Sequence, residues 1–162
     1  MSSLIRLRDS LLALCARLAF LPPLLARLVI GLVFVHSGWG KLHHLDKVTQ
    51  FFASLGIPHP ELQAPFVASV ELGCGALVLL GLATRLAAFP LIGTMVVALA
   101  TALAAKIDGL QSLLGLAEFL YLVLLVQLIV GGAGALSLDR LVAPLLGAAA
   151  PTAPLGRRAG AA

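Results

Sequence analysis

Three ionisable residues stand out because each lies inside an otherwise apolar stretch of the chain. Glu71 and Glu118 each interrupt a stretch of twenty residues that holds no other charge, and His36 lies in a third apolar stretch. A charged side chain at the centre of a bilayer costs about 3 kcal/mol on insertion scales, so such a group normally faces the protein interior and finds a partner. These residues therefore predict proton exchange, or the binding of a ligand's polar group, inside a membrane protein.

The predicted site combines these groups with side chains that share their helix faces. Its predicted catalytic, proton-exchanging residues are Glu71 and Glu118. The predicted ligand-binding residues lie within one or two helical turns of these glutamates or beside the histidine: His36, Trp39, Lys41, Cys74 and Tyr121. In the alternative interpretation, the glutamates only hold helices together, His36 is a structural histidine and Cys74 is a small apolar filler.

The composition decides what kind of protein must position these residues. Of 162 residues, 60% are hydrophobic and only 11% are charged, whereas a soluble domain carries about 25% charged residues. Soluble enzymes and nucleic-acid-binding modules are therefore excluded, and the net charge of +4 is expected to orient the chain in a lipid bilayer. Cys15 and Cys74 are far apart, and the histidines lack metal-ligand spacing, so neither a disulfide framework nor a metal site is predicted.

The apolar stretches predict an all-α fold with four transmembrane helices. About 20 apolar residues cross the ~30 Å of bilayer hydrocarbon, and the predicted spans are residues 24–42, 65–84, 86–105 and 113–132. Pro65 is well placed as the first residue of the second span. Residues 1–23 form a predicted amphipathic helix on the membrane surface, residues 24–140 form the membrane domain, and residues 141–162 form a predicted disordered cytoplasmic tail.

Lysine and arginine residues divide unequally between the two sides of a four-span bundle. Three lie on one side, at Lys41, Lys47 and Lys106. Eight lie on the other side, at Arg6, Arg8, Arg17, Arg27, Arg85, Arg140, Arg157 and Arg158. Because cytoplasmic segments carry the excess of basic residues, we predict that both termini are cytoplasmic.

This topology predicts one polar site near the outer surface. At 1.5 Å per residue, Glu71 lies about 9 Å below the outer boundary, and Glu118 and His36 lie about 8 Å below it. The connection over residues 43–64 contains Phe51 and Phe52 and is predicted to fold back over the site as a lid.

Other polar and small residues predict contacts between the helices. Arg85 and Asp139 both follow helices that end on the cytoplasmic side, which predicts a structural ion pair between the second and fourth spans. Small residues at four-residue spacing predict close helix contact, and they occur at Ser69 and Gly73 and at Thr94, Ala98 and Ala102.

Several short motifs follow one another in order between residues 24 and 140. They are Arg27-Leu-Val-Ile-Gly31, His36-Ser-Gly38-Trp-Gly-Lys41, Phe51-Phe52, Gly56-Ile-Pro58, Glu71-Leu-Gly73, Gly81-Leu-Ala-Thr-Arg85, Glu118 and Ser137-Leu-Asp139. In order and spacing they are similar to motifs of the DoxX family of small bacterial membrane proteins. The resemblance implies a four-helix bundle in the bacterial inner membrane.

The resemblance also implies a function. The DoxX family takes its name from a subunit of a thiosulfate:quinone oxidoreductase, which implies a membrane subunit of a quinone- or sulfur-linked redox system. The chain has no paired haem histidines, no nucleotide-binding fingerprint and no dithiol, so a quinone or a redox partner protein would carry the electrons. Two alternatives remain open: a non-enzymatic scaffold for a soluble or secreted protein, and a small proton-coupled permease. Either could assemble as an oligomer.

Overall fold

The computed structural model describes residues 2–142, and these residues fold into helices joined by turns. The α-helices are α1 (Ser2–Arg17), α2 (Leu21–His43), α3 (Leu45–Ser54), α4 (Pro60–Leu80), α5 (Thr84–Ala100), α6 (Leu110–Leu114), α7 (Ala117–Gly131) and α8 (Leu138–Val142). A short 3-10 helix, η1 (Ala104–Lys106), lies between α5 and α6. The all-α fold class is confirmed. Most of the predicted tail, residues 143–162, lies outside the described residues.

Prolines and glycines determine where the long helices begin and end. Prolines occupy the first turns of α2 and α4, where the missing N–H group costs no helical hydrogen bond. Helix α4 ends at Gly81, whose φ of 71° lies in the left-handed region. The N–H of Leu82 then donates to the carbonyl oxygen of Leu77 at 2.9 Å, the arrangement of a Schellman C-cap.

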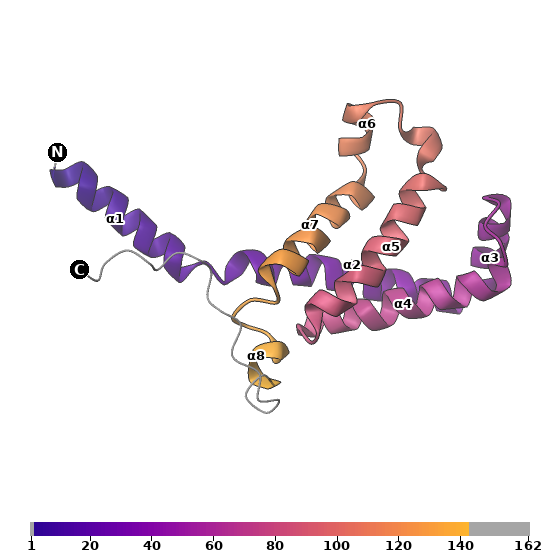
Figure 1. Ribbon diagram of the computed structural model, residues 1–162, viewed down its shortest axis with the longest axis horizontal. Helices are drawn as coiled ribbons and strands as arrows, with labels where there is room; N and C mark the ends of the chain where they lie inside the picture. The colour runs from indigo at the N-terminus through magenta and orange to yellow at the C-terminus, as the bar shows by residue number, and fades with distance from the viewer. Residues whose placement is uncertain (1, 143–162) are drawn as a thin grey trace.

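Two helix pairs form the bundle (Figure 1). Helices α2 and α4 lie side by side along most of their lengths, and α5 and α7 form a second pair that rises at a steep angle from the first. Helix α3 turns back beside the end of α4, while α1 extends away from the bundle. The buried core lies where the two pairs meet and contains Ile30, Phe34, Val78, Leu91, Leu125 and Leu128.

Glycines let the backbones of α2 and α4 touch. A Cβ atom on Gly31 would lie 2.6 Å from Leu79 Cβ, and one on Gly75 would lie 2.8 Å from Phe34 Cβ. A Cβ atom on Gly38 would collide with the backbone of α4 at Ala68 and Leu72. We refer to Gly31, Gly38 and Gly75 as the glycine seam, because only residues without a side chain fit at these three contacts.

The small residues predicted to pack helices together do not form this contact. A Cβ atom on Gly73 would have no neighbour within 4 Å, and Ser69 is exposed. Thr94, Ala98 and Ala102 line a cavity. Their spacing was correct for a common helix face, but spacing does not indicate which element that face meets.

Several predicted boundaries differ from the observed helices. Helix α4 begins at Pro60, so Pro65 lies inside the helix and not at its start. Helix α5 ends at Ala100, and the stretch predicted as the fourth span is divided between α6 and α7. Residues 43–64 contain α3, which folds back beside α4, and residues 141–142 belong to α8 and not to a tail.

Within the described residues 2–142, two helical segments have the length and apolar composition of a membrane span. They are Leu4–His43, which joins α1 and α2, and Pro60–Leu80. Helices α5 and α7 are apolar but shorter. Large apolar side chains are exposed on all of these helices, including Leu86, Phe89, Leu120 and Val130, as expected where lipid and not water surrounds a helical membrane bundle.

Candidate functional site

A cavity of about 830 Å³ opens between the two helix pairs and beneath α3. Its walls come from α2, α4, α5 and α7, and the turn over residues 55–58 joins α3 in covering one side. Most of the lining is apolar, and the charged side chains in it are Lys41, Glu71 and Glu118. Lys41, Glu71 and Glu118, which were predicted to form a polar site, therefore line a partly open space of ligand size.

Glu71 is fixed by two donors from α2. The glutamate is 2% exposed, and its Oε1 accepts a hydrogen bond from Lys41 Nζ at 2.5 Å. Its Oε2 accepts a hydrogen bond from Ser37 Oγ at 2.8 Å. Ser37 and Lys41 lie four residues apart and so project from one face of α2. Together they satisfy both oxygens of the buried carboxylate.

Ser37 was not among the predicted site residues, although the sequence contains a pattern that indicates it. A hydroxyl group one helical turn before Lys41 shares the face of that lysine, and Gly38 brings this face against α4. Lys41, one of the predicted site residues, turns inward and pairs with Glu71.

Glu118 lines the same cavity from α7 and is half-buried. It forms no hydrogen bond or ion pair with any residue in the described range 2–142. Tyr121, one turn later, also lines the cavity, and its ring packs edge-on against Phe34 with centroids 6.4 Å apart. Glu118 is thus the carboxylate of the cavity that is left available to a ligand.

Three of the predicted ligand-binding residues do not line the cavity. His36 is exposed on α2 and takes no part in the cavity wall. Trp39 is 57% exposed and stacks on His43, with ring centroids 4.4 Å apart. Cys74 packs against the hydrophobic core. The prediction placed all three by depth and helix face, but it could not determine the rotation of each helix about its own axis, α2 for His36 and Trp39 and α4 for Cys74.

A second polar cluster lies at the opposite end of the bundle. Arg27 is 4% exposed, and its guanidinium group donates to four main-chain carbonyl oxygens. The acceptors are Val78 at 3.1 Å, Leu79 at 3.1 Å, Ala133 at 2.8 Å and Leu136 at 2.6 Å. Arg27, which the sequence places among the basic residues of the cytoplasmic side, is therefore held inside the bundle. It joins the end of α4 to the segment after α7.

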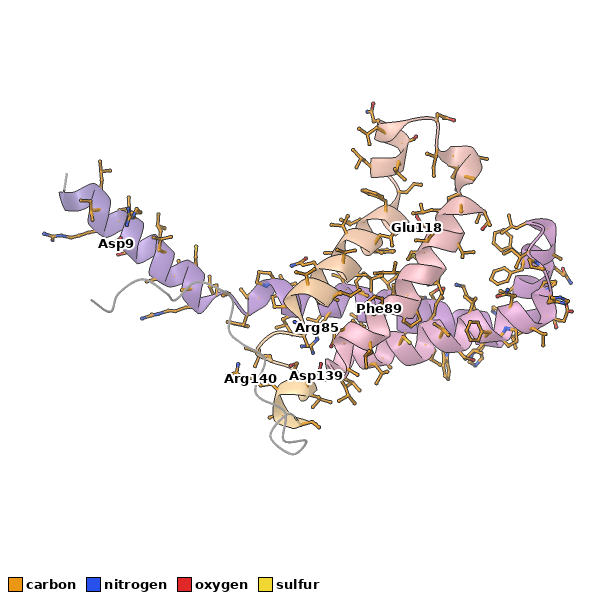
Figure 2. The ribbon with its side chains drawn as sticks, viewed as in Figure 1. Asp9, Arg85, Phe89, Glu118, Asp139 and Arg140 are labelled. Atoms are coloured by element: carbon orange, nitrogen blue, oxygen red, sulfur yellow. The ribbon has the colours of Figure 1, made fainter. Side chains whose placement is uncertain are left out.

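The predicted ion pair between Arg85 and Asp139 is not formed. Within residues 2–142 the ion pairs are Arg8–Asp9 and Lys41–Glu71. Asp139 instead accepts hydrogen bonds from the main-chain N–H groups of Ala83 at 2.6 Å and Thr84 at 3.3 Å. Figure 2 shows Arg85, Asp139 and Arg140 together at the end of the bundle opposite Glu118. Asp139 caps the first turn of α5.

Comparison with known proteins now places this architecture in a family. The family model described as DoxX matches residues 23–104. A Bacillus subtilis (strain 168) protein named "Putative oxidoreductase CatD" is 36% identical over 121 residues, which is 74% of this chain and 85% of that protein.

The chain belongs to the DoxX family. Two Escherichia coli (strain K12) relatives are named as inner membrane proteins. YqjF is 28% identical over 74% of this chain and 90% of its own length. YphA is 37% identical over 38% of this chain and 44% of its own length. No solved structure matches the chain. The DoxX match spans α2 to α5 and so includes Lys41 and Glu71, while Glu118 lies beyond it.

Proposed function

We propose that this DoxX-family protein is the inner-membrane subunit of a redox system and that its cavity binds the ring of a quinone. The observation that carries the proposal is a mostly apolar cavity of about 830 Å³ in which Glu118 has no partner among residues 2–142. Flat aromatic rings suit an apolar cavity lined by Phe and Tyr side chains. One relative is named "Putative oxidoreductase CatD" and two others are named inner membrane proteins, which supports both the chemistry and the location.

The lining residues fit the polar atoms of a quinone. Tyr121 offers a hydroxyl group, and Lys41 has N–H groups beyond the one that meets Glu71, so both can donate to ring oxygens. Glu118 can take up or release a proton beside the ring. A bound quinone would supply electron transfer, and a redox partner protein would exchange those electrons with it. In this proposal Glu71 is a positioning residue, because Lys41 and Ser37 occupy its carboxylate.

The proposal is tested with a quinone titration. Purified protein reconstituted in liposomes is titrated with a short-chain quinone, and binding is followed by equilibrium partition. We expect Glu118→Gln to retain ring binding within about threefold. In membranes that still contain the electron-donating partner protein, the same variant should lower proton-coupled quinone reduction by about 100-fold, the lower end of what a general acid or base contributes. Glu61→Gln, an exposed glutamate in the first turn of α4, is the matched control. Absence of quinone binding by the wild-type protein would refute the proposal.

A scaffold role for a soluble or secreted partner is the second candidate, and α1 is the observation that favours it. Helix α1 leaves the bundle with its apolar side chains exposed, including Leu4, Leu7, Leu11 and Leu14. In the predicted topology α1 lies on the cytoplasmic membrane surface, where basic residues such as Arg6 and Arg17 meet anionic lipid. Deletion of residues 2–17 with retention of quinone binding, but loss of a co-purifying protein, would favour the scaffold role.

A further inference from the structure

The charges that line the cavity do not balance. Lys41 and Glu71 neutralise each other through their contact at 2.5 Å, and Glu118 is the third and last charged residue of the lining. Glu118 lies in the first turn of α7, at the positive end of the helix dipole. The cavity therefore carries one net negative charge within mostly apolar walls.

Aromatic side chains from several helices line the same cavity as this charge. Five rings line the cavity: Phe34, Phe51, Phe52, Phe66 and Tyr121. The face of an aromatic ring attracts a cation, and the attraction grows when water is excluded. Phe51 and Phe66 are 51% and 65% exposed, so they lie at the rim, where a lipophilic molecule would enter from the bilayer.

We propose that this cavity binds lipophilic organic cations, with the charged centre of the ligand at Glu118 and its apolar groups against the aromatic side chains. The volume of about 830 Å³ lies within the range of roughly 300–1,000 Å³ that holds drug-sized ligands. An organic anion would meet the free carboxylate of Glu118 and be repelled. This binding activity does not depend on the proposed redox role.

The test uses tetraphenylphosphonium, a permanently charged lipophilic cation, with equilibrium dialysis of the purified protein in neutral detergent. We expect saturable binding by the wild-type protein and at least about tenfold weaker binding by Glu118→Gln, because the variant removes the net charge. Glu61→Gln changes the overall charge equally but lies outside the cavity, so its affinity should equal that of the wild type.

Two further variants separate the effect of charge from that of structural damage. Both break the contact between Lys41 and Glu71, but they change the net charge of the cavity in opposite directions. Glu71→Gln leaves Lys41 uncompensated and should weaken cation binding, whereas Lys41→Gln removes the positive charge and should leave binding equal or tighter. If both variants weakened binding to the same extent, the charge argument would be overturned. Cation binding no stronger than that of empty micelles would also overturn it.

A neutral naphthoquinone in the same assay distinguishes the two proposals. Its binding should not respond to net charge, so Lys41→Gln should not improve it. Naphthoquinone binding without cation binding would overturn this inference and leave the redox proposal intact. Cation binding without naphthoquinone binding would support this inference and overturn the redox proposal.

Discussion

Arg27 fills most of its hydrogen-bonding capacity with main-chain carbonyl groups. Two acceptors belong to the end of α4, and two belong to the segment between α7 and α8. Gly81 makes room for this arrangement, since a Cβ atom there would lie 2.5 Å from Arg27 Cζ. One buried guanidinium group thus joins parts of the chain that are far apart in sequence.

We predict that Arg27→Met destabilises the protein by about 3 kcal/mol, because the variant leaves buried carbonyl oxygens without donors. Thermal unfolding in detergent, followed by circular dichroism, measures the change. Arg17→Met removes an exposed arginine from α1 and should unfold at the wild-type temperature. Equal destabilisation by the two variants would show that the carbonyl contacts of Arg27 contribute nothing specific.

At the scale of elements, the glycine seam sets the distance between α2 and α4. Gly38 shows this most clearly, because the backbone of α4 at Ala68 and Leu72 occupies the space that a side chain at position 38 would need. The same contact places Ser37 beside Glu71. The position of Ser37 relative to Glu71 in the cavity wall therefore depends on the backbone packing between α2 and α4.

We predict that Gly38→Ala destabilises the bundle by about 2 kcal/mol, as overpacking of a close contact typically does. Gly40→Ala should stabilise it by up to about 1 kcal/mol, since alanine is the better helix former and nothing lies within 4 Å of a Cβ atom at Gly40. Denaturation with increasing concentrations of a harsh detergent would compare the two variants. If Gly40→Ala destabilised the protein and Gly38→Ala did not, the role of the glycine seam in packing α2 against α4 would be contradicted.

Sequence patterns predicted the all-α membrane fold and the proximity of Glu71, Lys41, Glu118 and Tyr121 to one cavity. They could do so because apolar length indicates a membrane helix and because isolated charges must find partners. The patterns failed for His36 and Trp39, which depend on the rotation of α2. They also failed for Arg85 and Asp139, because Asp139 found main-chain donors at the start of α5.

At the scale of the whole molecule, the number of membrane crossings separates two arrangements. Helices α2 and α4 have the full length of a span, while α5 and α7 are shorter. If all four cross, the turn between α5 and α6 lies on the same outer side as α3. If only α2 and α4 cross, that turn remains on the cytoplasmic side.

We predict four crossings with both termini in the cytoplasm. In a variant without native cysteines, Asp46→Cys in α3 and Asp108→Cys before α6 should react with a membrane-impermeant maleimide in intact spheroplasts. Arg140→Cys in α8 should react only after the membrane is opened. Labelling of Asp46→Cys but not of Asp108→Cys would favour the arrangement with two crossings.

The separation between Arg27 and its acceptors also bears on how the protein is made. A ribosome delivers α2 early, whereas the carbonyl groups of Ala133 and Leu136 follow 106 and 109 residues later. Until they arrive, the end of α4 supplies only two of the four carbonyl groups that Arg27 binds in the folded protein. The buried contacts of the first long helix are therefore completed only when the end of the bundle has been made. A chain that stops before residue 133 would lack half of these acceptors.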